Sequence, residues 1–196
     1  FNPAPLAAFI DAFVIGEGEE IISEIATTII ESKKKNRPRM ALLESLATLG
    51  GIYVPLLHKP GQTILKRTVA DLNSWRHPEK PLAPLMQAVH DRIALEIARG
   101  CTRGCRFCQA GMIWRPYRER NVLILLEMAE KMLRATGHDE ISLLSLSAGD
   151  YTCLQALLQA LMHKHFSERV ALALPSLRVE SLTEEMIKEI KRIRKT

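Results

Sequence analysis

The chain has 196 residues, with 27 Lys and Arg against 22 Asp and Glu, a formal net charge of +5, and 47% apolar residues. This composition is typical of a globular protein and excludes a disordered tail or a low-complexity linker. Four cysteines are too few for a disulfide scaffold, and the longest aliphatic run, Val122 to Leu126, is far shorter than the roughly 20 residues that span a bilayer. We therefore expect no membrane segment.

The two chain ends predict an internal piece of a longer protein. The sequence opens with Phe1 rather than Met and carries no signal-peptide pattern. It stops at Thr196, directly after an amphipathic helical pattern and without a cap. We expect such a piece to be inactive by itself and to associate through an unpaired sheet edge.

Residues 1–35 predict the last unit of a doubly wound α/β domain. Residues 12–15 are typical of a buried strand, and Gly16 to Glu19 of a tight turn. A helix is expected from Glu20 to Lys35, and its apolar face comprises Ile21, Ile22, Ile25 and Ile29. The acidic turn lacks the third glycine of a phosphate-binding loop, which favours a structural role.

Residues 36–92 contain six prolines and are predicted to form a connector between domains. Two short strands are expected in it, over residues 52–54 and 64–69.

From residue 93 onward, strand patterns alternate with helical patterns. Strands are expected over residues 93–98, 141–147 and 170–174, and helices over 122–135, 154–166 and a last segment that Thr183 caps. This order indicates a parallel sheet covered by helices. Three such units cannot close a barrel, so residues 93–196 are expected to form half of one.

Three cysteines, Cys101, Cys105 and Cys108, follow the first of these strands with the spacing C-x3-C-x2-C. Loops after parallel strands carry the chemistry in α/β folds, and neighbouring thiolates bind zinc or an iron–sulfur cluster. Structural zinc needs four protein ligands, yet the next cysteine, Cys153, lies 45 positions further on. A cluster with one open coordination position is favoured. The alternatives are a zinc site completed by a distant histidine and three unrelated thiols.

This segment resembles the cluster motif of radical S-adenosylmethionine (radical SAM) enzymes, including the aromatic Phe107 before the third cysteine. Residues 93–196 resemble the first half of the family's partial (β/α)6 TIM-like barrel. Residues 1–35 resemble the end of a cobalamin-binding-type domain, which is doubly wound and precedes the barrel in one branch. The stretch from Cys101 to Arg120 is similar to an uncharacterised subfamily with an additional C-terminal domain. The expected fold class is therefore α/β.

The resemblance implies that the three cysteines bind three irons of a 4Fe-4S cluster, and that S-adenosylmethionine chelates the fourth. An electron from a reductant such as flavodoxin or ferredoxin would cleave this cofactor to a 5′-deoxyadenosyl radical, which acts on an unknown substrate. Cobalamin is left open as a cofactor of the full-length protein. Reduced thiols suit a cytoplasmic location.

A second motif of the family, a Gly-Gly-Glu-like turn, corresponds to residues 147–150, with Asp in place of Glu. The resemblance implies that Gly149 and Asp150 lie against the methionine amino group of the cofactor. The alternative is that Asp150 caps the following helix. Ser176 and Arg178, after the third strand, are further candidates for cofactor binding, with loop capping as their alternative.

Six arginines surround the cysteines, at positions 99, 103, 106, 115, 118 and 120. Three roles are open for them. They could tune the reduction potential of the cluster, bind an anionic partner such as a nucleic acid, or be ordinary surface charges. A non-catalytic module that binds zinc and uses these arginines to bind nucleic acid is a rival function. A second rival, still enzymatic, is a tRNA methylthiotransferase-like enzyme.

Overall fold

In the computed structural model the described residues are 2–59, 61–75, 77–86 and 88–193. They divide into two compact units, Phe1–Ala70 and Asp71–Thr196. The chain ends that indicated an internal piece, Phe1 and residues 194–196, lie outside the described residues. In the described part, no helix combines the length and apolar character needed to cross a bilayer.

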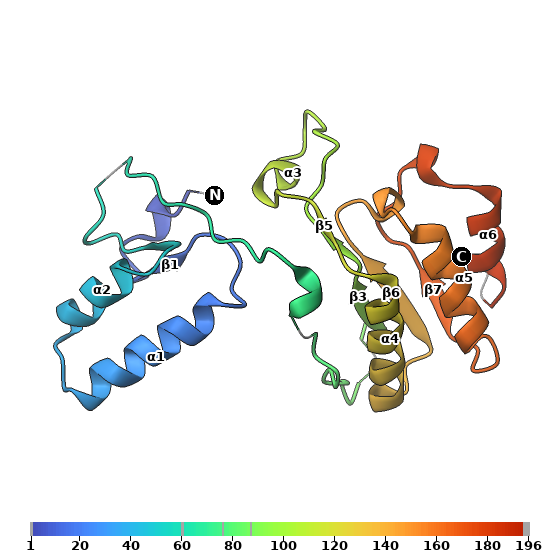
Figure 1. The fold of residues 1–196 in the computed structure, drawn as a ribbon, viewed down its shortest axis with the longest axis horizontal. Helices are drawn as coiled ribbons and strands as arrows, with labels where there is room; N and C mark the ends of the chain where they lie inside the picture. Colours follow the sequence, from blue (N-terminus) through green and yellow to red (C-terminus); the bar gives the residue numbers. More distant parts are fainter. Residues whose placement is uncertain (1, 60, 76, 87, 194–196) are drawn as a thin grey trace. The chain divides into compact units, whose positions relative to one another are not determined.

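The first unit packs two helices against two short strands (Figure 1). Its elements are η1 (Ala4–Leu6), β1 (Phe13–Val14), α1 (Ile21–Lys34), α2 (Arg39–Ala47) and β2 (Ile52–Tyr53). β1 pairs with β2 in antiparallel orientation. The small buried core comprises Ile21, Leu43, Leu46, Ile52 and Val54.

Three details of this unit differ from the sequence prediction. The strand over residues 12–15 is not buried, since Val14 is exposed, and α1 turns Ile22 toward solvent with 62% of its surface accessible. The antiparallel pair also differs from the parallel strands of a doubly wound domain. Helices cover the two short strands in one layer only, which leaves Val14 of β1 and Ile22 of α1 exposed.

The segment expected to form a strand over residues 64–69 instead makes an isolated bridge between Gly16 and Arg67. The Arg67 guanidinium donates to Glu24 at 2.9 Å, and the Val69 N–H donates to Glu17 at 2.6 Å. Side-chain contacts with the start of α1 therefore hold this segment, and the strand prediction is wrong. Residues 36–70 lie in the first compact unit and residues 71–92 in the second. The assignment of residues 36–92 to a connector between domains stays a prediction.

The second unit contains a three-stranded parallel sheet in the order β3-β6-β7, with a helix after each strand (Figure 1). Its longer elements are β3 (Ile93–Glu96), α4 (Val122–Thr136), β6 (Glu140–Leu144), α5 (Leu154–His165), β7 (Ala171–Ala173) and α6 (Glu184–Lys191). This mixed α/β arrangement is consistent with part of a radical SAM-type barrel. The three expected helices and their strand partners are confirmed, although the strand over residues 141–147 ends at Leu144.

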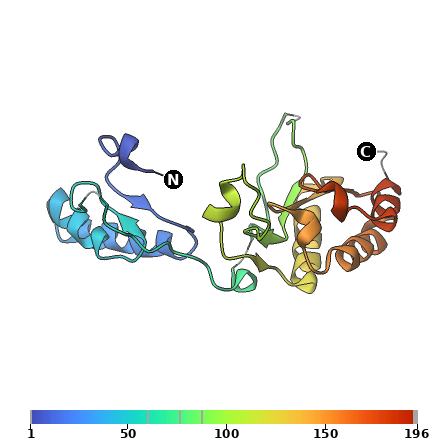
Figure 2. The same cartoon turned by 90° about the horizontal axis from the view of Figure 1, so that it is seen from above.

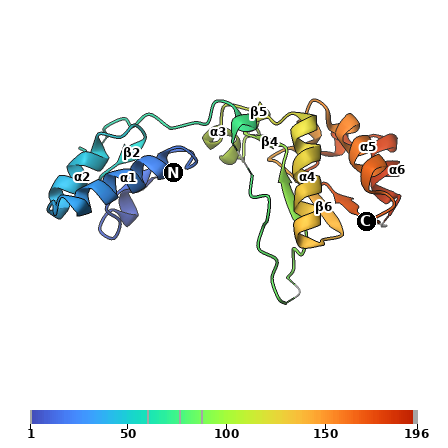
Figure 3. The ribbon, with the colours of Figure 1, turned by 60° about the horizontal axis from the view of Figure 1, so that its bottom comes forward.

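Apolar side chains of the sheet and helices form one core in this unit. α4 packs along β3 (Figure 3). Its buried side chains include Leu125, Ala129 and Met132, which lie on one face of the helix. Thr183 caps α6, since its hydroxyl accepts the Met186 N–H at 3.2 Å. Residues 77–86 and 88–92, which precede β3, contain no helix or strand and lie along a loop that projects from the unit (Figure 2).

The shorter elements of the second unit lie around the chain segments that join these strands and helices. They are η2 (Leu72–Ser74), β4 (Ala98–Arg99), α3 (Ala110–Ile113), β5 (Arg118–Glu119), η3 (Ala148–Asp150) and η4 (Val179–Ser181). The segments after β3, β6 and β7 meet at one end of the sheet, because the strands are parallel (Figure 1).

Candidate metal centre

The cysteine loop, residues 100–109, leaves β4 and returns through α3 to β5. β4 and β5 pair in antiparallel orientation, Ala98 opposite Glu119 and Arg99 opposite Arg118. This short ladder closes the base of the loop at the carboxyl end of the parallel sheet. The strand predicted over residues 93–98 is thus split, since β3 stays in the sheet while β4 turns away toward β5.

Gly100 permits the two arms of this loop to approach each other. Its φ is +92°, a left-handed conformation that favours glycine. A Cβ atom there would lie 2.6 Å from the Pro116 carbonyl oxygen and 2.7 Å from that of Trp114. Any side chain at this position would therefore push the returning arm away and displace Cys101, the next residue.

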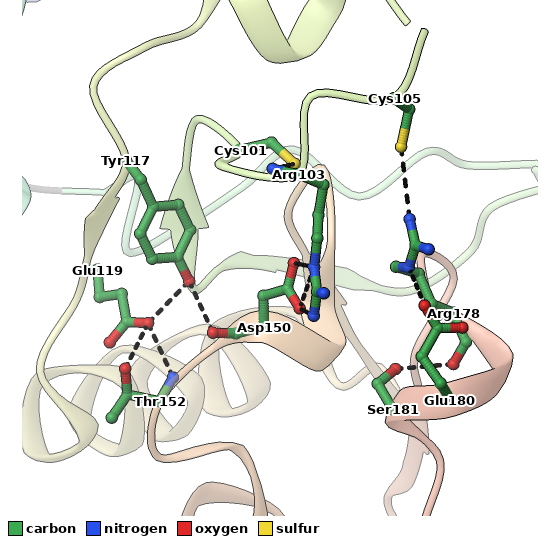
Figure 4. A network of polar contacts seen from close by, with 10 residues as sticks. All are labelled: Cys101, Arg103, Cys105, Tyr117, Glu119, Asp150, Thr152, Arg178, Glu180 and Ser181. Carbon is green, nitrogen blue, oxygen red and sulfur yellow. Dashed lines mark hydrogen bonds and ion pairs between the residues drawn. The ribbon is translucent and has the colours of Figure 1, made fainter. Parts of the chain in front are cut away.

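The three thiols of the motif are half-buried on this loop, whereas Cys153 is exposed. The Cys101 sulfur accepts the backbone N–H of Arg103 at 3.5 Å, and the Cys105 sulfur accepts from Nη1 of Arg178 at 3.4 Å (Figure 4). Cysteine sulfur is a soft ligand, and these two sulfurs lie where polar groups of the second unit converge. The donor set therefore fits a soft metal centre.

No three metal-binding side chains in the described ranges lie close enough to hold a single metal ion. A multi-iron cluster makes a different demand, because each thiolate binds a different iron. Three cysteines spread along one loop suit that requirement.

Asp150, at the end of η3, faces the cysteine loop. Its carboxylate accepts from Nε of Arg103 at 3.0 and 2.8 Å and also from Nη2 (Figure 4). These hydrogen bonds lower the pKa of Asp150 despite its burial. Asp150 does not cap α5, whose N-cap position is Cys153, so that alternative is wrong.

A polar network that sequence reasoning missed links β5 to this turn. The Tyr117 hydroxyl donates to Glu119 at 2.7 Å and to the Asp150 carbonyl at 3.3 Å. Glu119 accepts the Thr152 N–H at 2.8 Å and its hydroxyl at 3.0 Å (Figure 4). Burial is the largest cause of the raised pKa of Tyr117, and the hydrogen bond to Glu119 and the charge of Glu119 raise this pKa further. The only sequence signal was the polar run of residues 115–120.

The remaining predicted site residues have different surroundings. Gly149 packs against Ser181. The Ser176 carbonyl accepts the Ala148 N–H at 2.8 Å, and this hydrogen bond joins the turn after β6 to the turn after β7. Arg178 donates to Glu180 at 2.5 Å as well as to the Cys105 sulfur. Phe107 is 92% exposed, so its ring does not pack into the second unit.

Each of the two units matches a known protein family. Residues 95–195 match the family described as "Radical SAM superfamily", and residues 1–55 match "Radical SAM proteins, N-terminal". The chain belongs to the radical SAM superfamily. It is also 27% identical over 195 residues to an uncharacterized protein of Methanocaldococcus jannaschii, covering 97% of this chain and 38% of that relative's length. The cobalamin-binding branch stays a prediction.

Radical SAM membership implies a 4Fe-4S cluster and S-adenosylmethionine. The contacts of the six arginines near the cysteines show which of them are bound to other parts of the fold. Arg99 donates to Glu96 at 2.9 Å, and Arg103 pairs with Asp150. Arg120 is 4% exposed, lies 3.3 Å from Glu96 and donates to the carbonyls of η2 and Trp75. At least three of the six arginines are therefore engaged within the fold.

Glu96 receives two of these arginines. Burial acts to raise its pKa, but the hydrogen bond and charge of Arg99, together with the charge of Arg120, outweigh burial, so the pKa is lowered. The carboxylate thus links the end of β3 to Arg99 of β4, the strand from which the cysteine loop departs.

Proposed function

We propose that Cys101, Cys105 and Cys108 hold a 4Fe-4S cluster and that the protein is an enzyme that cleaves S-adenosylmethionine reductively. One observation carries the proposal: three half-buried thiols lie on a loop that is closed by β4 and β5 at the carboxyl end of a parallel sheet. When bound, the cluster supplies the single electron for cleavage and receives it from an external reductant such as flavodoxin or ferredoxin.

In this proposal, the side chains around the loop bind and orient. Arg178 and the Arg103 backbone N–H donate to two of the thiolate sulfurs. Asp150 offers a carboxylate for the amino group of the cofactor, and the Ala148 to Ser176 hydrogen bond holds its turn. The network of Tyr117 and Glu119 fixes the same turn from the β5 side.

The test is a set of single Cys→Ala variants of the full-length protein, reconstituted with iron and sulfide without oxygen. Loss of Cys101, Cys105 or Cys108 is expected to abolish the charge-transfer absorbance of the cluster, because each thiolate binds its own iron. Cys153→Ala is the matched control, since Cys153 is exposed and outside the loop, and it should keep the absorbance. Equal loss in all four variants, or in none, would contradict the assignment.

A further inference from the structure

The ion pair between Arg103 and Asp150 joins the cysteine loop to the turn after β6. Arg103 lies between two of the proposed cluster ligands, and its backbone N–H donates to the Cys101 sulfur. Its guanidinium reaches across to the carboxylate with both Nε and Nη2 (Figure 4). The pair thus brings one positive and one negative charge together beside the first thiol.

Neither partner of this pair is saturated. A guanidinium carries five N–H donors, and Nη1 of Arg103 has no acceptor within the described ranges, since only Nε and Nη2 are engaged. A carboxylate has about four acceptor positions, and Arg103 makes three contacts with the two Asp150 oxygens, which leaves room for a further donor. Both charged groups can therefore bind a further ligand without losing each other.

The exposure of this pair distinguishes it from a structural ion pair. The Arg103 side chain is 43% exposed, while Asp150 is 12% exposed. Arg120, by contrast, is 4% exposed and donates hydrogen bonds to Glu96 and to backbone carbonyls. A buried arginine that a ligand cannot reach supports the fold, whereas an accessible arginine with a spare donor group can contact a ligand.

An α-amino acid end group is the ligand chemistry that this arrangement matches. Its ammonium and carboxylate branch from one carbon atom, so two complementary charges must lie side by side to receive both. Asp150 would accept from the ammonium, and Arg103 would donate to the carboxylate in a charge-assisted, directional contact.

We propose that Arg103 is a specificity residue that binds the carboxylate of the methionine portion of S-adenosylmethionine and acts together with Asp150. This inference rests on the proposed function and adds a residue from within the cysteine loop. It predicts that the fragment Cys101 to Cys105 contributes to cofactor recognition through a side chain as well as through its thiols.

The test is a binding cycle on the full-length, reconstituted protein, with iron and sulfide content checked for each variant. Wild type, Arg103→Gln and Arg103→Lys are titrated calorimetrically with S-adenosylmethionine and with decarboxylated S-adenosylmethionine, which lacks only the carboxylate. Arg106→Gln is the matched control, because Arg106 is an exposed arginine of the same loop. The ratio of affinities between variants cancels any contact that the carboxylate makes elsewhere.

Arg103→Gln is expected to weaken S-adenosylmethionine binding about tenfold to hundredfold and the binding of the decarboxylated ligand less than about threefold. Arg103→Lys should recover part of the affinity, since it keeps charge but loses the planar fork. Equal weakening for both ligands would overturn the inference and leave Arg103 as a support for Asp150. Tighter binding by Arg103→Gln would overturn it too, because Arg103 would then compete with the cofactor. If the wild type with a full cluster does not bind S-adenosylmethionine, the proposed function fails along with the inference.

Discussion

Gly149→Ala tests the packing that holds the Asp150 turn in place. A Cβ atom at Gly149 would lie 2.1 Å from Oγ and 2.4 Å from Cβ of Ser181. The φ of Gly149 is outside the left-handed region, so the cost is steric. The Ser181 hydroxyl is tied to the Arg178 carbonyl at 2.7 Å, and its Cβ moves only with the backbone. Lengthening the contact with the Ser181 Cβ from 2.4 Å to even 3.0 Å requires η3 and η4 to separate by about 0.6 Å.

Overpacking of this kind typically costs about 1–3 kcal/mol. Native-state hydrogen exchange of the full-length protein, followed by mass spectrometry of peptides from α5 and β7, measures the opening free energy of this unit. Gly149→Ala should lower that free energy by about 1–3 kcal/mol. In the Ser181→Gly background the same substitution should cost less than about 0.5 kcal/mol, because the clashing atoms are gone.

Gly18→Ala is the control for the change from glycine to alanine, since nothing lies within 4 Å of its added Cβ. It should change stability by less than about 0.5 kcal/mol. An unchanged opening free energy in Gly149→Ala, or an equal loss with and without the Ser181 side chain, would refute the packing argument.

Two further predictions concern carboxylates of the second unit. Asp150→Asn should weaken S-adenosylmethionine binding at least about tenfold by calorimetry while iron content is unchanged, because it removes the charge but no cluster ligand; unchanged affinity would exclude cofactor contact. The pKa of Glu96 is lowered in the folded state, so its stabilising effect is fully present above its ordinary value of 4.5 and is lost as pH falls through the lowered pKa. Glu96→Gln should therefore flatten the fall in urea stability below about pH 4.5, and an unchanged slope there would show that Glu96 does not contribute.

The second unit was predictable because its elements are long enough to show periodicity. The Thr183 cap and the alternation of strands and helices both follow from local sequence, and the structure contains both. The position of the cysteine loop followed from the same order of elements, because the end of a parallel strand fixes where the next loop lies.

The features that the sequence did not predict depend on contacts between distant segments, or are elements too short to show a sequence pattern. β4 and β5 contain two residues each, too few for any periodicity, yet they close the cysteine loop. Arg103 and Asp150 lie 47 positions apart, so no local signal joins them. α2 was not predicted, because the six prolines of residues 36–92 favoured a connector, although a proline such as Pro38 is well tolerated immediately before a helix.

The most direct test of the central claim is the metal content of the full-length protein after oxygen-free purification and reconstitution. The account predicts about four iron and four sulfide per chain, bound through three cysteines. It also predicts that the Cys101→Ala, Cys105→Ala and Cys108→Ala variants lose this iron while Cys153→Ala retains it. One zinc per chain with no sulfide, in a protein that does not take up iron, would contradict the account.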